Sequence, residues 1–394
     1  MKTIAVLGGG PAGAFAAERL ARSGIKTLVF DEKLAWEKPC GGGLTYKAYR
    51  KYPFLIDNSV PKKLVTDTCL AAPQAGAVTL KLTRPLVIYS RFDLNRMLLE
   101  RAERAGAQLE KTRVLSIARS AGGWLIQTRH GSQAADYIIV ATGARNPLRS
   151  VGTEWTGADT MLALGYYVAS EQTYIDIQFL AKLEGYIWIF PRCGHLSVGI
   201  CGKGESAQSL RARLERYMDA KGIGYKDASF YSHVLPSLGS AGWKGNRVAG
   251  DGWLAVGDAA GLVDPITGEG LYYALRSADL ATQVVLSQAH AAGDNAQAYR
   301  NLLGQDFAED LEFSAMLAQR VFLGTFLFGA IPARMVQFVR RSPRFREVVQ
   351  DLFAGTQPYV GLRRRLMRNL TRTLYEVASN LLLRRGHEYG VELS

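Results

Sequence analysis

Hydrophobic positions in the first thirty residues follow the order strand, helix, strand. Residues 4–7 form an apolar run, Ala17 and Leu20 continue one face of a helix, and residues 28–30 form a second apolar run that ends at Asp31. A short apolar run bounded by turn residues is typical of a buried strand. The pattern therefore predicts a β-α-β unit at the start of the chain.

The turn between the first strand and the helix has the spacing G-x-G-x-x-G, in residues 8–13. Gly8 allows a tight turn, Gly10 lets backbone amides approach a pyrophosphate, and Gly13 lets the helix pack closely on the sheet. The helix N-terminus offers N–H groups and partial positive charge to phosphates. Asp31 lies where a carboxylate can accept from ribose hydroxyls. The unit predicts binding of a dinucleotide, FAD or NAD; an ordinary glycine turn is the alternative.

The later strands of such a fold are separated from the first by other elements. Buried parallel strands are expected at 137–141 and 253–257, helices at 91–105, 208–218 and about 270–290, and alternating antiparallel strands within 60–90 and 161–202. The remainder is expected to be helical to the C-terminus. A dehydrogenase with a contiguous nicotinamide domain does not show this order.

The fold class predicted is α/β, with a three-layer FAD-binding domain built from separated segments, an antiparallel β-sheet substrate domain and a helical C-terminal region. We expect the FAD-binding domain in residues 1–59, 86–155 and 245–300, the substrate domain in 60–85 and 156–244, and the helical region in 301–394. At 394 residues, the chain exceeds one ordinary core.

Composition and charge narrow the functional classes. The hydrophobic fraction of 48% is that of a globular protein, and we expect neither a signal peptide nor a metal site. Four irregularly spaced cysteines favour a reducing cytoplasm. The net charge of +13 is concentrated from Arg320 onward, where every lysine or arginine is an arginine. Such a region fits an anionic lipid surface better than a nucleic acid; a solvated helical face is the alternative.

A second motif lies at residues 257–270, with the pattern G-D-A-A-G-x-x-x-P-x-x-G-E-G. It resembles the second flavin fingerprint of the p-hydroxybenzoate-hydroxylase-like flavoproteins. The resemblance implies that Asp258 holds the ribityl chain of FAD and that Gly268, Glu269 and Gly270 lie beside the isoalloxazine. A capped helix with no ligand is the alternative.

Two further segments resemble parts of the same fold. Residues 90–95 resemble a helix entry in which an arginine, here Arg91, reaches the pyrophosphate, although Asn95 replaces the more usual aspartate. Residues 141–145 occupy the place of a central turn, where Thr142 departs from the usual Asp-Gly. The use of a nicotinamide reductant is therefore left open.

Residues 39–44 (P-C-G-G-G-L) and 185–191 (G-Y-I-W-I-F-P) resemble motifs of the geranylgeranyl reductase family, which saturates isolated double bonds of isoprenoid chains. Alternation places Tyr186, Trp188 and Phe190 on one face of a strand. An apolar aromatic wall suits an isoprenoid, although any sheet facing a core shows such alternation. The resemblance places Cys40 near the flavin; a small buried hydrophobic residue is the alternative.

The predicted function is FAD-dependent reduction of carbon–carbon double bonds in an isoprenoid or other apolar substrate, with NAD(P)H or a small electron-transfer protein as reductant. Cys40, Tyr186 and Trp188 are the catalytic candidates, and Tyr186, Trp188 and Phe190 contact substrate. The alternatives are an FAD-dependent monooxygenase of aromatic substrates and a non-enzymatic basic binding protein. The candidate FAD-binding residues are Gly8, Gly10, Pro11, Ala12, Gly13, Asp31, Glu32, Cys40, Gly41, Gly42, Arg91, Val114, Ala141, Thr142, Gly143, Asp258, Pro265, Gly268, Glu269, Gly270 and Leu271.

A final expectation concerns residues 322–331, which are too short to span a bilayer. Their aromatic residues are followed by several arginines, beginning at Arg334. We expect a helix that lies on an anionic membrane with its aromatics inward. In the alternative, the aromatics pack on the sheet domain.

Overall fold

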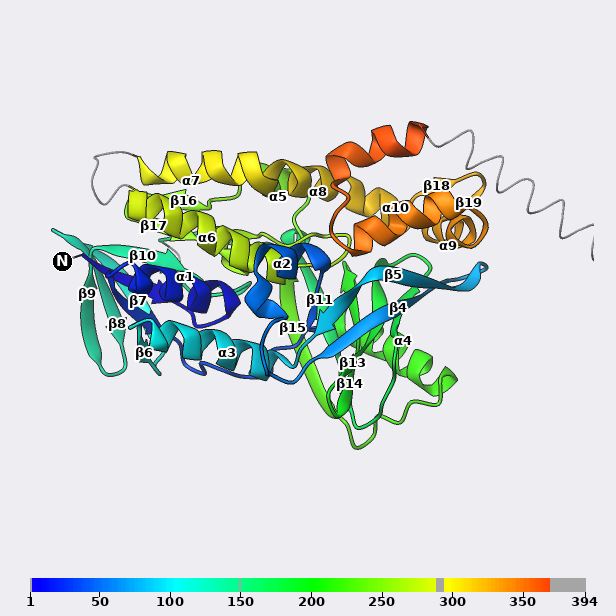
Figure 1. Cartoon of the computed structure of the whole chain (residues 1–394), viewed down its shortest axis with the longest axis horizontal. Helices are drawn as coiled ribbons and strands as arrows, with labels where there is room; N and C mark the ends of the chain where they lie inside the picture. Colours follow the sequence, from blue (N-terminus) through cyan, green and yellow to red (C-terminus); the bar gives the residue numbers. More distant parts are fainter. Residues whose placement is uncertain (1, 149, 288–293, 369–394) are drawn as a thin grey trace, which may run out of the picture.

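A computed structural model describes residues 2–148, 150–287 and 294–368. The first of its sheets has six strands in the order β16-β17-β10-β1-β2-β6 (Figure 1). The pairs among β17, β10, β1, β2 and β6 are parallel, and β16 closes the edge antiparallel. The strands are β1 (Thr3–Leu7), β2 (Lys26–Phe30), β6 (Gln108–Glu110), β10 (Tyr137–Val140), β16 (Ala249–Gly250) and β17 (Trp253–Ala255).

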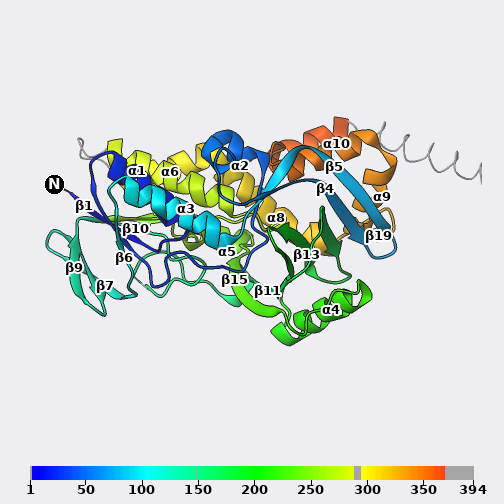
Figure 2. The same cartoon turned by 60° about the horizontal axis from the view of Figure 1, so that its bottom comes forward.

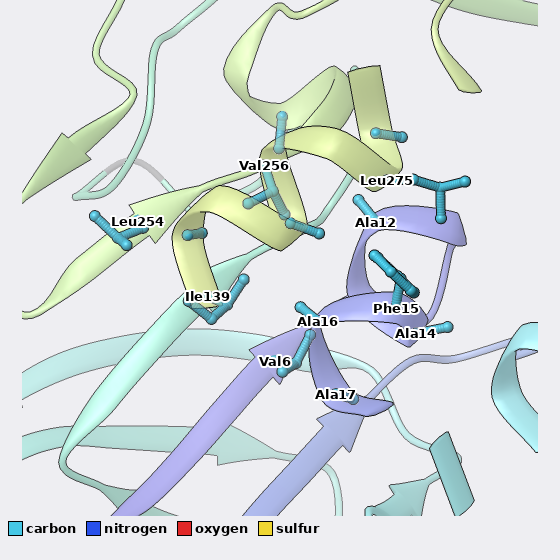
Figure 3. Close-up of a cluster of buried hydrophobic side chains, with 14 of the residues drawn as sticks. Val6, Ala12, Ala14, Phe15, Ala16, Ala17, Ile139, Leu254, Val256 and Leu275 are labelled. Carbon is cyan, nitrogen blue, oxygen red and sulfur yellow. The ribbon is translucent and has the colours of Figure 1, made fainter. Parts of the chain in front are cut away.

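Helices and a small sheet complete three layers around this sheet. Helix α1 (Pro11–Arg22) packs against α3 (Arg91–Arg104) and α6 (Leu271–Ser287). A three-stranded antiparallel sheet, β7 (Val114–Ser120), β8 (Gly123–Thr128) and β9 (Gly131–Ala135), packs against β1 and β10. Figure 3 shows the core, where Ala12 and Ala16 of α1 lie among Val6, Ile139 and Val256. Small residues on α1 let it approach the sheet closely.

The second sheet has eight strands in the order β15-β11-β14-β13-β12-β4-β5-β3. All of its pairs are antiparallel except β12–β4, which is parallel, so the antiparallel prediction is wrong for that pair. A hairpin cannot join β4 to β12, because strands of the first sheet lie between them in the chain. The strands are β3 (Gly43–Leu44), β4 (Lys63–Ala72), β5 (Gly76–Ile88), β11 (Thr160–Val168), β12 (Ile175–Phe179), β13 (Glu184–Arg192), β14 (His195–Lys203) and β15 (Ser229–Pro236).

The two faces of the eight-stranded sheet contact different layers. Trp188 packs into one hydrophobic cluster together with Tyr186 and Phe190, whereas Ile187 and Ile189 belong to another. The predicted alternation along β13 is therefore confirmed. Helix α4 (Ala207–Ala220) covers the isoleucine face (Figure 2). The aromatic face is covered by the C-terminal helices.

The C-terminal helices are interrupted by a short β-hairpin. The segment consists of α7 (Asn295–Leu303), a π-helical turn (Gly304–Ala308), α8 (Glu309–Leu323), β18 (Thr325–Phe326), β19 (Gly329–Ala330), α9 (Ile331–Arg341) and α10 (Pro343–Phe353). The helix expected over 322–331 is wrong, because α8 ends at Leu323 and Gly324 adopts an extended conformation. The last part of the predicted helical region, residues 369–394, lies outside the described residues. Within the described ranges no helix is long and apolar enough to cross a membrane.

Smaller elements connect these layers, and two strands cross the domain limits expected from the sequence. Strand β3 joins the eight-stranded sheet although it lies within 1–59, and β5 continues past residue 85. The other elements are α2 (Tyr46–Lys51), α5 (Ser240–Lys244), the 3₁₀ turns Pro53–Leu55, Gly157–Asp159 and Gly257–Ala260, and helical residues at 359–368.

Replacing Gly199 by alanine should destabilise the protein, because a Cβ at Gly199 would lie 2.3 Å from the ring of Trp188. Overpacking of this kind costs about 1–3 kcal/mol in free energy of unfolding, which chemical denaturation measures. Gly224→Ala is the matched control, since a Cβ there meets nothing within 4 Å. Equal stabilities of the two variants would show that Trp188 is not seated on Gly199.

Candidate active site

The first glycine turn is packed against the end of β10. Gly8 has φ of +116°, and a Cβ there would lie 2.2 Å from the carbonyl oxygen of Ala141. A Cβ on Gly13 would lie 1.9 Å from the carbonyl oxygen of Gly8. Gly10 differs, because nothing lies within 4 Å of its Cβ position at the N-terminus of α1. The turn is therefore closed toward the sheet and open where a phosphate would approach.

Asp31 holds the glycine turn to the following loop. Its Oδ2 accepts from the backbone N–H of Gly9 at 2.7 Å, and its Oδ1 accepts from those of Lys33 and Leu34, each at 2.7 Å. The carboxylate thus shapes the loop that follows β2. Its predicted contact with ribose hydroxyls stays a prediction, and Glu32 beside it is exposed.

The two fingerprint motifs meet in space. A Cβ on Gly257 would lie 3.1 Å from the Cβ of Ala12, and one on Gly270 would lie 3.4 Å from Oδ1 of Asp258. Asp258 forms an ion pair of 2.7 Å with Lys38. Burial opposes ionisation of Asp258, but the ammonium of Lys38 holds its pKa below the usual value. Sequence reasoning missed Lys38. The only indication in the sequence was the position of Lys38 directly before the Pro39-Cys40 motif.

The loop of residues 38–44 is held by an ion pair between a buried arginine and a partly buried glutamate, which sequence reasoning also missed. Arg192, at the end of β13, has no exposed side-chain surface; it pairs with Glu37 and donates to the carbonyl oxygen of Cys40. Glu37 also accepts from the backbone N–H groups of Arg91 and Phe92, at 2.9 and 3.1 Å, and so caps α3. The pair ties the loop to α3 and to the aromatic strand.

The glycines of this loop lie directly against their neighbours. Cβ atoms on Gly41 and Gly43 would each lie 3.0 Å from the ring of Phe190. Gly42 has φ of +81°, and a Cβ there would lie 2.1 Å from the carbonyl oxygen of Tyr89. Larger residues would displace the loop from the strand that carries Phe190.

Cys40 and Arg91 are close together inside the protein. The Cys40 Sγ accepts from the backbone N–H of Gly42 at 3.3 Å. Burial raises the pKa of this thiol, but the nearby guanidinium of Arg91 and the Gly42 N–H outweigh that effect and lower it below its usual value. Arg91 donates to Asn95 at 3.4 Å, and its Nε is buried without a partner. That unpaired donor is available to an anionic group.

The aromatic face of β13 lies against the second fingerprint. The Tyr186 hydroxyl donates to the carbonyl oxygen of Thr267 at 2.5 Å and would lie 2.9 Å from a Cβ on Gly268. Phe322 of α8 stacks on Tyr186 with 6.5 Å between ring centroids. Trp188, Tyr186 and Phe322 thus form a packed apolar cluster, which we call the aromatic wall, and its Tyr186 contacts the Gly268 turn.

Glu269 is a partly buried carboxyl group between the second fingerprint and the loop after β3. Its Oε1 accepts from the Thr45 hydroxyl at 2.9 Å. Burial raises the pKa of Glu269 to about 7, although Lys47 and the Thr45 hydroxyl act in the opposite direction. The carboxyl group can therefore hold or release a proton near neutral pH. Thr45 was not foreseen from the sequence.

The other predicted cofactor-binding residues lie in several different environments. Pro265 and Leu271 are buried beside the second fingerprint, and Gly143 has φ of +80° with nothing within 4 Å of its Cβ position. Thr142 is occupied by a hydrogen bond of 3.1 Å to Asn146. Val114 packs against the core of the six-stranded sheet.

These residues fit FAD in three respects. The space at Gly10 admits a pyrophosphate at a helix N-terminus, the buried Nε of Arg91 offers a donor, and Asp258 offers a carboxylate where the two fingerprints meet. Lys38 pairs with Oδ2 of Asp258, so Oδ1 of that carboxylate could accept from a hydroxyl of the cofactor.

Comparison with known proteins agrees with this geometry. Residues 2–173 match the family described as pyridine nucleotide-disulphide oxidoreductase. The chain is 29% identical to geranylgeranyl diphosphate reductase of Arabidopsis thaliana, over 72% of this chain and 65% of that protein. It is 27% identical to menaquinone reductase of Mycobacterium tuberculosis, over 84% and 87% of the two chains. It is also 27% identical to digeranylgeranylglycerophospholipid reductase 2 of Methanothermobacter thermautotrophicus, over 80% and 87%.

A solved structure shares the whole fold. The geranylgeranyl bacteriochlorophyll reductase-like protein of Thermoplasma acidophilum superimposes with a TM-score of 0.77 at 23% identity, covering 93% of this chain and 99% of that one. The fold, the two fingerprints and the family match define an FAD-dependent oxidoreductase. Within that class, several of the relatives that the chain resembles are named as geranylgeranyl reductases. The predicted fold class and enzyme class are confirmed.

Gly10→Val should give a folded protein without flavin. The Cβ position is open and the backbone φ is −65°, so the fold tolerates the side chain, but the branched group would occupy the space of the pyrophosphate. Visible absorbance after gel filtration measures bound flavin, and circular dichroism measures folding. Gly224→Val, at another open position, should keep its flavin. A yellow Gly10→Val protein would contradict the placement of the pyrophosphate.

Glu269→Gln should flatten the pH dependence of stability. The pKa of the Glu269 carboxyl rises from 4.5 to about 7 on folding. As the pH increases, the unfolded chain therefore loses this proton at a lower pH than the folded protein does. The free energy of unfolding should therefore fall as pH rises through this window. Denaturation of the FAD-free protein between pH 4.5 and 7 measures the slope. Glu154→Gln, which changes an exposed side chain, is the control and should keep the wild-type slope. An unchanged slope in Glu269→Gln would contradict the raised pKa of Glu269.

Proposed function

We propose that this protein uses FAD to reduce isolated carbon–carbon double bonds of an isoprenoid substrate. The observation that carries the proposal is the aromatic wall, whose Tyr186 contacts the Gly268 turn directly. The names of the relatives support the same substrate class, because two of them include a geranylgeranyl group. When bound and reduced, FAD supplies the hydride.

The aromatic wall suits a substrate without charge or polar groups. Trp188 is buried, and Phe322 and Phe179 surround Tyr186 with centroids 6.5 Å from its ring. An isolated alkene has no adjacent carbonyl to accept charge, so addition of hydride requires a proton and develops positive charge on carbon. The negative faces of aromatic rings stabilise such charge in a dry site.

We propose Cys40, Tyr186 and Trp188 as the residues that act on the substrate. Cys40 lies in the loop seated on Phe190, and its thiol is held beside Arg91. The glycines of both fingerprints, with Asp31, Arg91 and Asp258, are proposed to hold FAD. The reductant is proposed to be NAD(P)H or a small electron-transfer protein; Thr142 leaves the choice open.

We further propose that the protein works in the cytoplasm and meets its apolar substrate at a membrane surface. Isoprenoid chains are poorly soluble in water, and the arginine-rich region after Arg320 offers positive charge to anionic lipids. The cysteines Cys40, Cys69, Cys193 and Cys201 are free thiols, which a reducing compartment would keep in that state.

A product assay tests the function. The purified FAD-bound protein, reduced chemically with dithionite and given a geranylgeranyl substrate in detergent, should yield a product heavier by two hydrogens per reduced double bond. Mass spectrometry under isotopically heavy oxygen separates the monooxygenase alternative, which would incorporate the label. Gly10→Val serves as the flavin-free blank. Incorporated oxygen, or no product above the blank, would overturn the proposal.

A further inference from the structure

The turn between α8 and α9 exposes large apolar side chains. Phe326 and Leu327 are 43% and 47% exposed, and Phe328 is fully exposed. Together these three residues form what we call the hairpin tip. Leu323, at the end of α8, is exposed beside them. The hairpin lies at the end of the molecule opposite the N-terminus, next to α9 (Figures 1 and 2).

The backbone of the hairpin tip is strained. Phe326 pairs with Gly329, so Leu327 and Phe328 form a two-residue turn, and their φ angles are +47° and +59°. Such turns favour Asn-Gly, because bulky residues adopt positive φ only at a cost. Arg334 holds the turn by donating to the carbonyl oxygens of Phe326 and Leu327, at 3.3 and 2.5 Å. Folding alone gives no reason to place two large apolar residues there.

The hairpin directly follows the helix that supplies Phe322 to the aromatic wall. Phe322, four residues before Phe326, stacks on Tyr186, and Val336 and Val339 of α9 are buried in the same hydrophobic cluster. One short segment therefore contributes Phe322 to the aromatic wall and also exposes the apolar residues of the hairpin tip.

The stretch of sequence that contains the hairpin carries charge of one sign. Residues 313–346 contain six arginines and neither aspartate nor glutamate. Arg340 donates to the carbonyl oxygens of Ala75 and Ala77 at the edge of the eight-stranded sheet. Apolar side chains bordered by arginines match an anionic bilayer, with apolar groups entering the acyl region and cations contacting the headgroups.

We propose that the hairpin tip inserts into an anionic lipid bilayer and docks the aromatic wall at the membrane surface. This inference extends the proposed function. It rests on that function only where it takes the bilayer as the source of the isoprenoid substrate. Docking at this site would place the cover formed by α8 and α9 between the bilayer and the aromatic wall. A prenyl chain would then pass from lipid to the site along apolar groups.

Vesicle binding of the purified FAD-bound protein tests the inference. Phosphatidylcholine vesicles with and without phosphatidylglycerol, free of prenyl lipids, are sedimented at low and high salt. The variant Leu327→Asn/Phe328→Asn removes the apolar groups, and asparagine tolerates positive φ, so the turn is preserved. The matched control is Leu115→Asn/Leu125→Asn, which changes two exposed apolar residues on β7 and β8 at the other end of the molecule.

The wild type and the control should bind anionic vesicles at low salt and lose binding at high salt. The hairpin variant should partition at least about tenfold less, since burial of a single such side chain corresponds to a factor of ten or more. In Phe328→Trp, brominated lipids should quench the added tryptophan fluorescence. Equal binding of variant and wild type, or no binding by the wild type, would overturn the inference.

Light scattering tests whether a second copy of the chain, instead of a bilayer, covers the hairpin tip. A second copy of the chain on the hairpin tip would give a wild-type dimer that the hairpin variant dissociates, without vesicle binding, and that result would also overturn the inference. Because the vesicles hold no substrate, failure here leaves the product assay in detergent intact. Failure of the product assay likewise leaves the vesicle result standing.

Discussion

A buried guanidinium joins the parts of this protein that must act together. Arg192 has no exposed surface, and it connects the end of β13 to Glu37 and to the carbonyl oxygen of Cys40. Glu37 in turn caps α3, which carries Arg91. The removal of one partner from a buried ion pair typically costs about 3–5 kcal/mol, because the other charge is left uncompensated. The relative positions of the aromatic wall, the Cys40 loop and Arg91 all depend on this pair.

Close backbone contacts play the corresponding role within the six-stranded sheet. Gly8 and Gly13 leave no room for side chains between the first turn, α1 and Ala141, whereas Gly10 leaves open space on the other side. Ala12 meets Gly257 of the second fingerprint. The same small residues therefore bring two distant motifs together and leave one face open for a cofactor.

The aromatic wall connects the chemistry to the C-terminal helices. Tyr186 touches the Gly268 turn on one side and Phe322 on another, so α8 is part of the site and not a separate appendage. Glu269, on the same turn, is partly buried and accepts from the Thr45 hydroxyl. Its raised pKa reflects the low polarity that an apolar substrate also requires.

The sequence alone predicted the β-α-β unit, the separated segments of the six-stranded sheet, the alternation along β13 and the family, because these depend on local spacing and on motifs. Only the tertiary structure decided the parallel pairing of β12 with β4, the pairing of Lys38 with Asp258 and that of Arg192 with Glu37. Each of these contacts joins residues far apart in the chain; Glu37 and Arg192, for example, differ by 155 in residue number. No local pattern encodes such a partner. The hairpin at 325–330 was likewise missed, because an apolar run of that length is compatible with either a helix or a strand. Its conformation depends on Arg334 and on the end of α8 at Gly324.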